Sequence, residues 1–369
     1  MARARRAAGA ARPDVRPARP GAKRAEGRSA RRQPAPETPR RATRDFHPAT
    51  ERAVPAPGRP AEAVTIPAVK GDVELDVGGR RVRLTNLDKV FFTTLGTTKR
   101  DLLQYYADVA PALLPHIRDR AMVMKRYPNG AEGAFFFMKR APSPRPDWIP
   151  TCAIEHASGS VIDFPVVNDV ATLLWTINLG CIDLNQWYAR CDDVDRPDYL
   201  HFDLDPVGDD VTFAAVREAA TAVNETLVAL GMSTCVKTTG SRGLHIYVPI
   251  VRGPTQKQVW QVSKTIALDV ARRHPRLLTA VYKKAARPAG RVLVDYNQNA
   301  WGRTLASVYS VRPRPRATVS MPVTWDEVSR GVSIEDFRID NAPERVRRVG
   351  DLWAPIAAAS GRFDLARFA

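Results

Sequence analysis

The alternation of apolar and polar residues becomes regular only from Asp72 onward, and it first predicts a β-hairpin. Residues 73–77 and 81–84 alternate apolar and polar side chains, as strands with one buried face do. Gly78 and Gly79 lie between these runs, and a Gly-Gly pair suits a tight turn. We therefore expect the folded part of the chain to begin with two antiparallel strands.

Three longer segments have the apolar spacing of amphipathic helices, at residues 98–114, 211–230 and 255–274. Thr98 and Asp101 stand near the spacing of an N-terminal capping box, which favours a helix start there. Four short apolar runs predict strands, at residues 199–204, 234–237, 244–249 and 291–295. Helices that separate strands in this order predict a mixed α+β fold.

The composition argues against several classes of protein. The chain has 369 residues, which suggests about two domains. It has no run of about 18 apolar residues that would cross a membrane, and its basic N-terminus lacks the apolar core of a secretory signal. The cysteines are too few for a disulfide framework and form no Cys-x-x-Cys pair: Cys152, Cys181, Cys191 and Cys235. We expect a cytoplasmic protein with reduced thiols.

The formal net charge of +17 is concentrated in the first 70 residues, which hold 17 Lys and Arg against 6 Asp and Glu. Phe46 and Ile66 are almost their only large apolar side chains. Burial therefore cannot offset the entropy of ordering, and we predict that residues 1–70 are disordered. An Arg-rich arm suits nucleic-acid phosphates. A solvated tail shaped by the codon bias of a GC-rich genome would have the same composition, and a transit peptide would contain more Ser.

Two carboxylates in a predicted strand are the first candidate for chemistry. Asp203 and Asp205 alternate with Phe202 and Leu204, so the acids share one face and the apolar side chains the other. Carboxylates about 7 Å apart repel each other unless a cation lies between them, and Mg²⁺ prefers such oxygen ligands. We expect Pro206 to end the strand and to leave the pair at its rim. A solvated strand end is the alternative interpretation.

A Gly-rich basic loop follows in the segment 237–247. Gly240 and Gly243 would let backbone N–H groups turn inward as an anion-binding nest. Its side chains add further donors for a triphosphate: Thr239, Ser241, Arg242 and His245. A plain hairpin loop with one polar strand face would also fit.

Asp295 ends the last predicted strand and could supply a third carboxylate. Alone, an Asp in this position is more often a cap or a turn former. Three carboxylates at strand ends beside a Gly-rich basic loop, however, match two-metal phosphoryl or nucleotidyl transfer.

Basic and aromatic residues form a further group. Lysines stand at Lys89, Lys99 and Lys125, and an aromatic run occupies residues 135–137. Aromatic side chains beside cations suit base stacking next to a bound backbone, although a Phe run is equally typical of a buried strand. Arg303 and Arg312 could reach phosphates or could lie on a surface strand.

Taken in order, these motifs resemble a known family. "DLDP" at 203–206, "TTGSRGLHIY" at 238–247 and "VDYNQN" at 294–299 resemble the polymerase domain of bacterial ligase D, within the archaeo-eukaryotic primase superfamily. The similarity covers about residues 80–340 and includes "LTNLDKVFF", "GTTK", "KRYPNG", "FFFMKRAP" and "RPRATVSMPVTWDEV".

This resemblance implies a primase-like α+β core with mixed or antiparallel sheets and flanking helices. It implies DNA-directed addition of NTPs, often preferred over dNTPs, at breaks during non-homologous end joining, with two Mn²⁺ or Mg²⁺ ions. It implies metal ligation by Asp203, Asp205 and Asp295. It implies nucleotide contacts from Lys125, Thr239, Ser241, Arg242, His245, Gln298 and Arg312. It implies that Lys89 and Lys99 bind a DNA 5′-phosphate, and that Phe136 and Phe137 stack near the template.

Three positions depart from the family pattern. Asn185 or one of its neighbours replaces a common His, Trp301 stands where a basic residue is frequent, and Arg303 replaces a common Lys. These departures bear on the nucleotide contacts rather than on the carboxylates.

The resemblance also implies how the chain is divided into domains. We predict a tail at 1–70 and a polymerase domain at 71–369, with a DNA-contacting part at 71–195, a catalytic part at 196–345 and a C-terminal segment at 346–369. No Lys-x-Asp-Gly ligase motif occurs. We therefore expect a standalone, nucleoid-associated bacterial polymerase without membrane attachment.

Its expected partners are DNA with 5′-phosphorylated breaks or gaps, Ku and a separate ATP-dependent DNA ligase. A primer-independent primase, a non-catalytic module that docks on DNA ends to recruit Ku and a ligase, and a metal-dependent nuclease are the alternatives.

Overall fold

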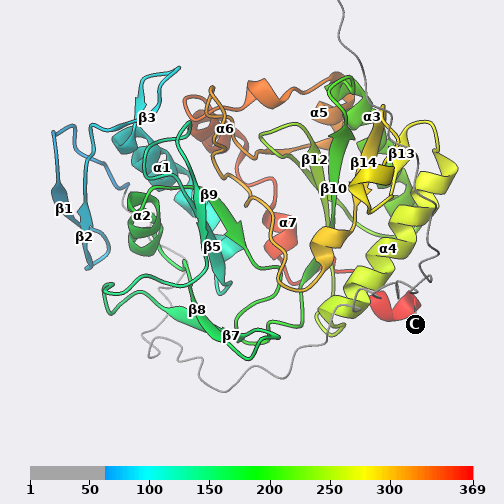
Figure 1. Ribbon diagram of the computed structural model, residues 1–369, viewed down its shortest axis with the longest axis horizontal. Coiled ribbons are helices and arrows are strands. Elements are labelled where there is room, and N and C mark those ends of the chain that lie inside the picture. Colours follow the sequence, from blue (N-terminus) through cyan, green and yellow to red (C-terminus); the bar gives the residue numbers. More distant parts are fainter. Residues whose placement is uncertain (1–62, 369) are drawn as a thin grey trace, which may run out of the picture. The chain divides into compact units, whose positions relative to one another are not determined.

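A six-stranded sheet organises the part of the chain that the computed structural model describes, residues 63–368 (Figure 1). Its order is β13-β14-β10-β12-β11-β15, and only β13 and β14 run parallel. The strands are β10 (Tyr199–Val207), β11 (Cys235–Thr238), β12 (Leu244–Pro249), β13 (Leu278–Thr279), β14 (Arg291–Asp295) and β15 (Pro322–Val323). The four predicted strands and the mixed α+β fold are thus confirmed.

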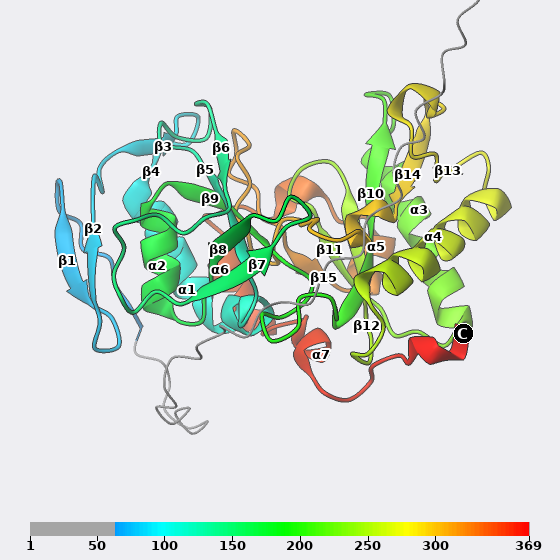
Figure 2. The same ribbon diagram turned by 60° about the horizontal axis from the view of Figure 1, so that its bottom comes forward.

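Two long helices cover the face of this sheet that turns away from β5 and β9 (Figures 1 and 2). These are α3 (Phe213–Ala229) and α4 (Gln256–Arg273), within a few residues of the predictions. Thr212 and Thr255 cap their first turns, which is why both helices begin there. Phe202 and Leu204 of β10 are fully buried, as expected for the apolar face of that strand.

A second sheet, in the order β6-β5-β9, has no counterpart among the predicted strands. It consists of β5 (Met122–Arg126), β6 (Phe136–Met138) and β9 (Cys181–Gln186). Beside it lie α1 (Lys99–Ile117) and α2 (Val170–Asn178). The predicted capping box is present, because Thr98 and Asp101 bind each other's backbone N–H groups.

Shorter elements complete the fold. The predicted hairpin is confirmed as β1 (Val73–Asp76) and β2 (Arg81–Leu84), with φ of 60° at Gly78 and 77° at Gly79. The other strand pairs are β3 (Val90–Phe92) with β4 (Thr97–Thr98) and β7 (Thr151–Glu155) with β8 (Val161–Pro165). The last α-helices are α5 (Trp325–Arg330), α6 (Ala342–Val349) and α7 (Ala354–Ala357). Within residues 63–368, no helix is both long and apolar enough to cross a lipid bilayer.

The predicted disordered segment 1–70 extends too far at its C-terminal end. Ile66 is fully buried, and its N–H donates to Oε1 of Gln104 on α1 at 2.8 Å. One isolated apolar residue thus gains enough contact from a helix distant in sequence to fix residues around it. Residues 1–62 of the predicted tail lie outside the described part of the chain.

Pro206 does not end β10, contrary to the prediction. The strand continues to Val207, and Pro206 pairs with Val292 of β14. Pairing with β12 on the other side stops at Leu204. One side of β10 is therefore without a neighbouring strand at Pro206, and a residue that lacks an N–H is tolerated there.

A buried ion pair joins the N-terminal helix to the start of the central strand. Arg120 follows α1 and Asp198 precedes β10, and both are almost inaccessible to solvent. Nη2 of Arg120 lies 2.7 Å from each carboxylate oxygen of Asp198, and Nε of Arg190 donates to the same carboxylate at 3.1 Å. The two halves of the fold are thus tied by charges that water does not screen.

We predict that Asp198→Ala lowers the free energy of unfolding by about 3–5 kcal/mol, because it leaves Arg120 charged and unpaired in the interior. Urea denaturation measures this loss. Asp340→Ala is the matched control, since Asp340 forms an exposed pair with Arg338 and should change stability by no more than about 0.5 kcal/mol. Similar losses in both variants would contradict the prediction.

Candidate active site

A cleft of about 490 Å³ lies between the six-stranded sheet and the β6-β5-β9 sheet. It gathers many of the predicted site residues from separate elements: Lys125, Phe137, Asp203, Asp205, Thr239, Ser241, His245, Gln298 and Arg312. The remaining predicted residues do not line it: Lys89, Lys99, Phe136, Arg242 and Asp295. The strand register and the loop contacts, described next, explain why some predicted residues line the cleft and others do not.

One row of charged and polar residues crosses four strands of the sheet. Lys237, His245, Asp203 and Asp295 are directly opposite one another on β11, β12, β10 and β14. Directly paired residues point to the same face of a sheet, so these side chains are neighbours. His245 Nε2 lies 3.1 Å from Asp203 Oδ1, and burial lowers the pKa of His245 well below its usual value.

The two carboxylates of β10 repel each other in a poorly solvated place. Burial, and then the charge of Asp295, raises the pKa of Asp203 to about 7. The charge of Asp203, and then burial, raises the pKa of Asp205 to about 7. Oδ1 of Asp203 is buried and makes no well-aligned hydrogen bond. Hard oxygen donors with an unsatisfied buried atom fit a divalent cation.

Asp295 lies beside this pair but is engaged locally. Its oxygens accept hydrogen bonds from Asn297 N at 2.8 Å and from Gln298 Nε2 at 3.1 Å, so it also forms the turn that was its alternative interpretation. Among residues 63–368, no three His, Cys, Asp or Glu side chains are gathered closely enough to hold a metal ion as they stand. Asp203 and Asp205 would hold an ion together with water and substrate oxygens, as Mg²⁺ sites commonly do.

The predicted anion nest does not form in the loop 239–243. The N–H groups of Ser241, Arg242 and Gly243 all donate to Oγ1 of Thr239, at 3.0–3.2 Å. The hydroxyl of Thr239 replaces the anion as their acceptor, a competition that a sequence pattern does not reveal. An anion in the cleft would instead meet side chains, above all those of Ser241 and Arg312.

The glycines of this loop are required by close packing. A Cβ on Gly243 would lie 2.1 Å from the carbonyl oxygen of Leu204. A Cβ on Gly240, whose φ is +63°, would lie 2.7 Å from Cγ of Arg312. The loop can therefore lie directly against β10 beside Asp205, with Arg312 stacked on it.

Arginines surround the loop in different ways. Arg312 donates from Nη1 to the carbonyl oxygen of Thr239 at 2.7 Å, and Arg314 binds Oγ of Ser241. Arg242, predicted to contact the nucleotide, instead pairs with Asp209 at 3.1 Å outside the cleft lining. The side chain of Arg242 is half exposed, so it remains free to move.

The two lysines predicted at the 5′-phosphate are neighbours but differ in exposure. Lys99 N–H donates to the carbonyl oxygen of Lys89 at 2.8 Å. Lys99 is 4% exposed and its Nζ donates to the carbonyl oxygen of Thr85. Burial, with a smaller effect of Lys89, lowers the pKa of Lys99 to about 8. Lys89 is exposed, with Nζ bound to Pro128 O.

The aromatic run is an exposed edge strand, so the buried-strand interpretation is wrong. Phe135, Phe136 and Phe137 are 50%, 43% and 60% exposed. Lys125 Nζ lies 4.2 Å from the ring centroid of Phe135, and the guanidinium carbon of Arg126 lies 5.2 Å from that of Phe136. Exposed rings beside cations are the arrangement expected of a base-stacking surface.

The positions that depart from the family pattern have different surroundings. Asn185 and Arg303 line the cleft. Trp301 packs edge-on against Trp187, with ring centroids 5.1 Å apart, and against His156 at 5.5 Å. Trp301 therefore fills an aromatic cluster behind the loop 302–306.

Sequence reasoning assigned no role to Asp183, which also lines the cleft. A charged residue between two apolar ones, here Ile182 and Leu184, is the signal that could have found it.

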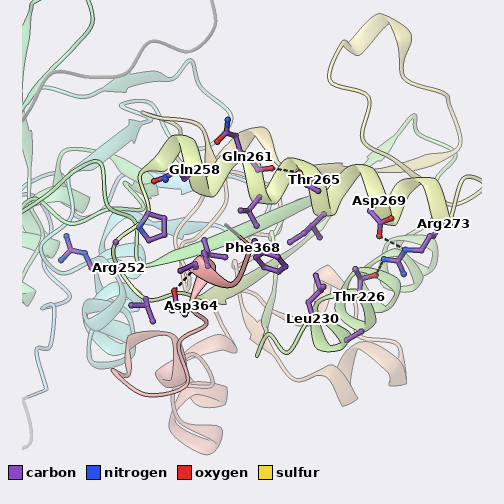
Figure 3. A pocket seen from close by; sticks show the side chains of 18 residues that line it. Thr226, Leu230, Arg252, Gln258, Gln261, Thr265, Asp269, Arg273, Asp364 and Phe368 are labelled. Atoms are coloured by element: carbon purple, nitrogen blue, oxygen red, sulfur yellow. Dashed lines mark hydrogen bonds and ion pairs between the residues drawn. The ribbon is translucent and has the colours of Figure 1, made fainter.

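A larger groove of about 930 Å³ lies elsewhere, between α4, the end of α3 and the C-terminal 3-10 helix Leu365–Phe368 (Figure 3). None of the predicted site residues lines it. Two of its charged side chains bind each other, since Nε of Arg273 donates to Asp269 at 2.9 Å. We therefore place the chemistry in the smaller cleft, where the carboxylates are.

We predict that Asp203→Asn raises the melting temperature by about 3–6 °C at pH 8. A raised carboxyl pKa in the folded state destabilises the fold above pH 7, and this penalty fades as the pH falls toward 4. The difference in melting temperature between Asp203→Asn and the wild type should therefore be smaller at pH 5 than at pH 8. Mn²⁺ should raise the melting temperature of the wild type and not that of the variant. Asp340→Asn is the control, and a variant that melts lower at pH 8 would contradict the prediction.

We predict that Gly243→Ala destabilises the protein by about 1–3 kcal/mol, because the new methyl group would collide with the backbone of Leu204. Gly253→Ala is the matched control, since a Cβ there would meet nothing within 4 Å. Urea denaturation compares the two variants. Equal free energies of unfolding for both variants would contradict the prediction, because the loop would then accommodate the methyl group without loss of stability.

Comparisons with known proteins agree with the resemblance seen in the sequence. Residues 98–353 match the family described as "LigD, primase-polymerase domain". The multifunctional non-homologous end joining protein LigD of Mycolicibacterium smegmatis is 35% identical over 280 residues, which are 75% of this chain and 36% of that protein. The bifunctional LigD of Bacillus subtilis is 30% identical over 274 residues, 73% of this chain and 43% of that protein. The chain thus spans less than half the length of these relatives.

A solved structure has a similar fold. The polymerase domain from Mycobacterium tuberculosis ligase D in complex with DNA superposes with a TM-score of 0.71 and 33% identity, over 76% of this chain and 99% of that one. The primase-like fold expected from the sequence is therefore confirmed. With the family match across most of the described residues, these findings show that the chain belongs to the LigD primase-polymerase domain family.

Proposed function

We propose that this protein is a DNA-directed nucleotidyltransferase that extends 3′ ends at DNA breaks during non-homologous end joining. One observation carries the proposal: Asp203 and Asp205 share a cleft with Ser241, His245 and Arg312. A carboxylate pair beside a cationic wall suits a metal-bound triphosphate. The relatives named for end joining, and the related domain solved with DNA, support the same reaction class.

The reaction would join the primer 3′-hydroxyl to the α-phosphate of a bound nucleotide, with pyrophosphate leaving. Divalent cations, Mn²⁺ or Mg²⁺, would neutralise the triphosphate and favour ionisation of the hydroxyl when held by Asp203 and Asp205, with Asp295 as the proposed third ligand. The chain's own contribution is orientation. Arg312 and Ser241 would bind the phosphate oxygens, and stabilise the negative charge that develops during transfer.

His245 would keep Asp203 in place. Its pKa lies well below the usual range, so it is neutral at pH 7 and adds no charge beside the carboxylates. Gln298 and Thr239 line the same cleft and would contact the nucleotide, Thr239 through its O–H, since its oxygen already accepts the loop N–H groups. Lys125 would act near the base, since it lies between the cleft and the exposed rings.

The DNA would lie on the side of the β5–β6 hairpin. Phe136 and Phe137 are exposed and would stack on the template, next to Arg126. Lys89 would bind a 5′-phosphate, and Lys99, being buried, would support that site from behind. Ku and a separate ATP-dependent ligase are the proposed partners, and a preference for ribonucleotides is the proposed substrate choice.

We predict that the wild type adds one nucleotide to a gapped, 5′-phosphorylated DNA in Mn²⁺, with ATP used better than dATP. Asp203→Ala should lower the extension rate at least about 100-fold, because the carboxylate that would hold the cation is lost. DNA binding by the same variant, measured by gel shift, should persist. Asp340→Ala, an exposed carboxylate outside the cleft, is the control and should extend normally.

Two outcomes would overturn this proposal. Extension by Asp203→Ala at the wild-type rate would remove the carboxylate from the chemistry. DNA binding without extension by the wild type, under any divalent cation, would instead favour a docking module that recruits other end-joining proteins.

A further inference from the structure

Asp183 is a charged residue in the interior of β9, and it has no role in the proposed reaction as described above. It is 1% exposed, yet it lines the cleft. It stands directly opposite Lys125 in the pairing of β9 with β5. On its other edge, β9 binds the segment that leads to Arg312, because Leu184 exchanges hydrogen bonds with Ser307 and Ser310. Asp183 therefore lies at the seam between the two walls of the cleft.

Its carboxylate is shared between two cations that come from opposite sides. Oδ1 lies 3.0 Å from Nε of Arg312, and Oδ2 lies 3.5 Å from Nζ of Lys125. Both cationic side chains are mostly buried, at 19% and 17% exposure. Charges at these distances attract strongly in a poorly solvated place.

Arg312 is held at three points and is left free at a fourth. Nε lies 3.0 Å from Oδ1 of Asp183 as an ion pair without an aligned hydrogen bond, Nη1 donates to Thr239 O at 2.7 Å, and Cγ packs so closely on Gly240 that no Cβ would fit. Nη2 makes no hydrogen bond with any residue of 63–368 in this structure, so it is available to a ligand. A guanidinium fixed in this way can bind an oxyanion without first losing rotational freedom.

Lys125 is fixed by aromatic rings as well as by Asp183. Its Nζ lies 4.2 Å from the ring centroid of Phe135, 5.4 Å from that of Tyr127 and 5.8 Å from that of Phe137. Phe135 and Phe137 are exposed rings of the proposed template surface. Asp183 thus pairs both with Arg312, which would bind the phosphates, and with Lys125, which lies next to the exposed aromatic rings.

Without Asp183 this region would hold an excess of positive charge. Removal of the carboxylate would leave Arg312 and Lys125 to repel each other and to turn toward solvent. The carboxylates of Asp203 and Asp205 would not replace it, because they would be neutralised by the cation proposed there.

We propose that Asp183 is a positioning residue that orients Arg312 toward the triphosphate and Lys125 toward the template surface, and so couples the two walls of the cleft. It contacts no substrate itself. This inference rests on the proposed nucleotidyl transfer. It differs from a merely structural role because its loss would change the kinetics of extension at a temperature where the fold is intact.

Single-nucleotide extension by Asp183→Asn tests the proposal. We expect kcat/KM for the incoming nucleotide to fall about 100-fold, through both a lower kcat and a higher KM, since a displacement of about 1 Å in a binding group has effects of that size. Asp183→Glu keeps the charge, so its kcat/KM should be at least about tenfold higher than that of Asp183→Asn. Asp198→Asn is the matched control: it alters a buried Asp–Arg pair away from the cleft and should lower the melting temperature with kcat/KM within about threefold.

A double-mutant cycle shows whether Asp183 acts through Arg312. If it does, adding Asp183→Asn to Arg312→Gln should change kcat/KM by no more than about threefold, whereas independent effects would multiply. Multiplying effects, or wild-type kinetics of Asp183→Asn, would overturn the proposal. If Asp183→Asn does not fold, the cycle is run with Asp183→Glu. Absence of extension by the wild type would overturn the proposed function instead, so the two failures are distinguishable.

Discussion

The repulsion between carboxylates on the central strand is the constraint around which this fold is arranged. Asp203 and Asp205 lie two residues apart on β10. Burial and the charge of Asp295 raise the pKa of Asp203 to about 7, and the charge of Asp203 and burial raise the pKa of Asp205 to about 7. The strand keeps them together because β12 and β14 bind its backbone and because Phe202 and Leu204 are fully buried on its other face. A divalent cation would relieve this repulsion, so stability and proposed chemistry depend on the same pair.

Two positively charged side chains of the cleft are held by a single carboxylate. Arg312 and Lys125 share one buried carboxylate, Asp183. These two cations are therefore held in place before a substrate arrives, and the guanidinium of Arg312 keeps one nitrogen free. Prearranged charge of this kind would stabilise the transition state of the proposed nucleotidyl transfer without further reorganisation.

The family relationship supports the proposed reaction class more directly than it supports the individual nucleotide contacts. The chain covers less than half of the LigD proteins that it resembles, and its departures from the family pattern have separate consequences. Trp301, at a position where the resemblance suggests a basic residue, packs edge-on against Trp187 in an aromatic cluster. Asn185 and Arg303 remain in the cleft lining, where they would alter contacts with the nucleotide.

The sequence by itself determined the elements whose signals are local. The strands Leu244–Pro249 and Arg291–Asp295 and the starts of α1 and α4 follow from apolar spacing and threonine caps, because these depend on residues a few positions apart. Tertiary structure alone decided that β10 continues through Pro206, that Ile66 is buried against α1, and that Thr239 occupies the loop amides. It alone brought Asp183 between Arg312 and Lys125, since pairing between distant strands sets which charges become neighbours.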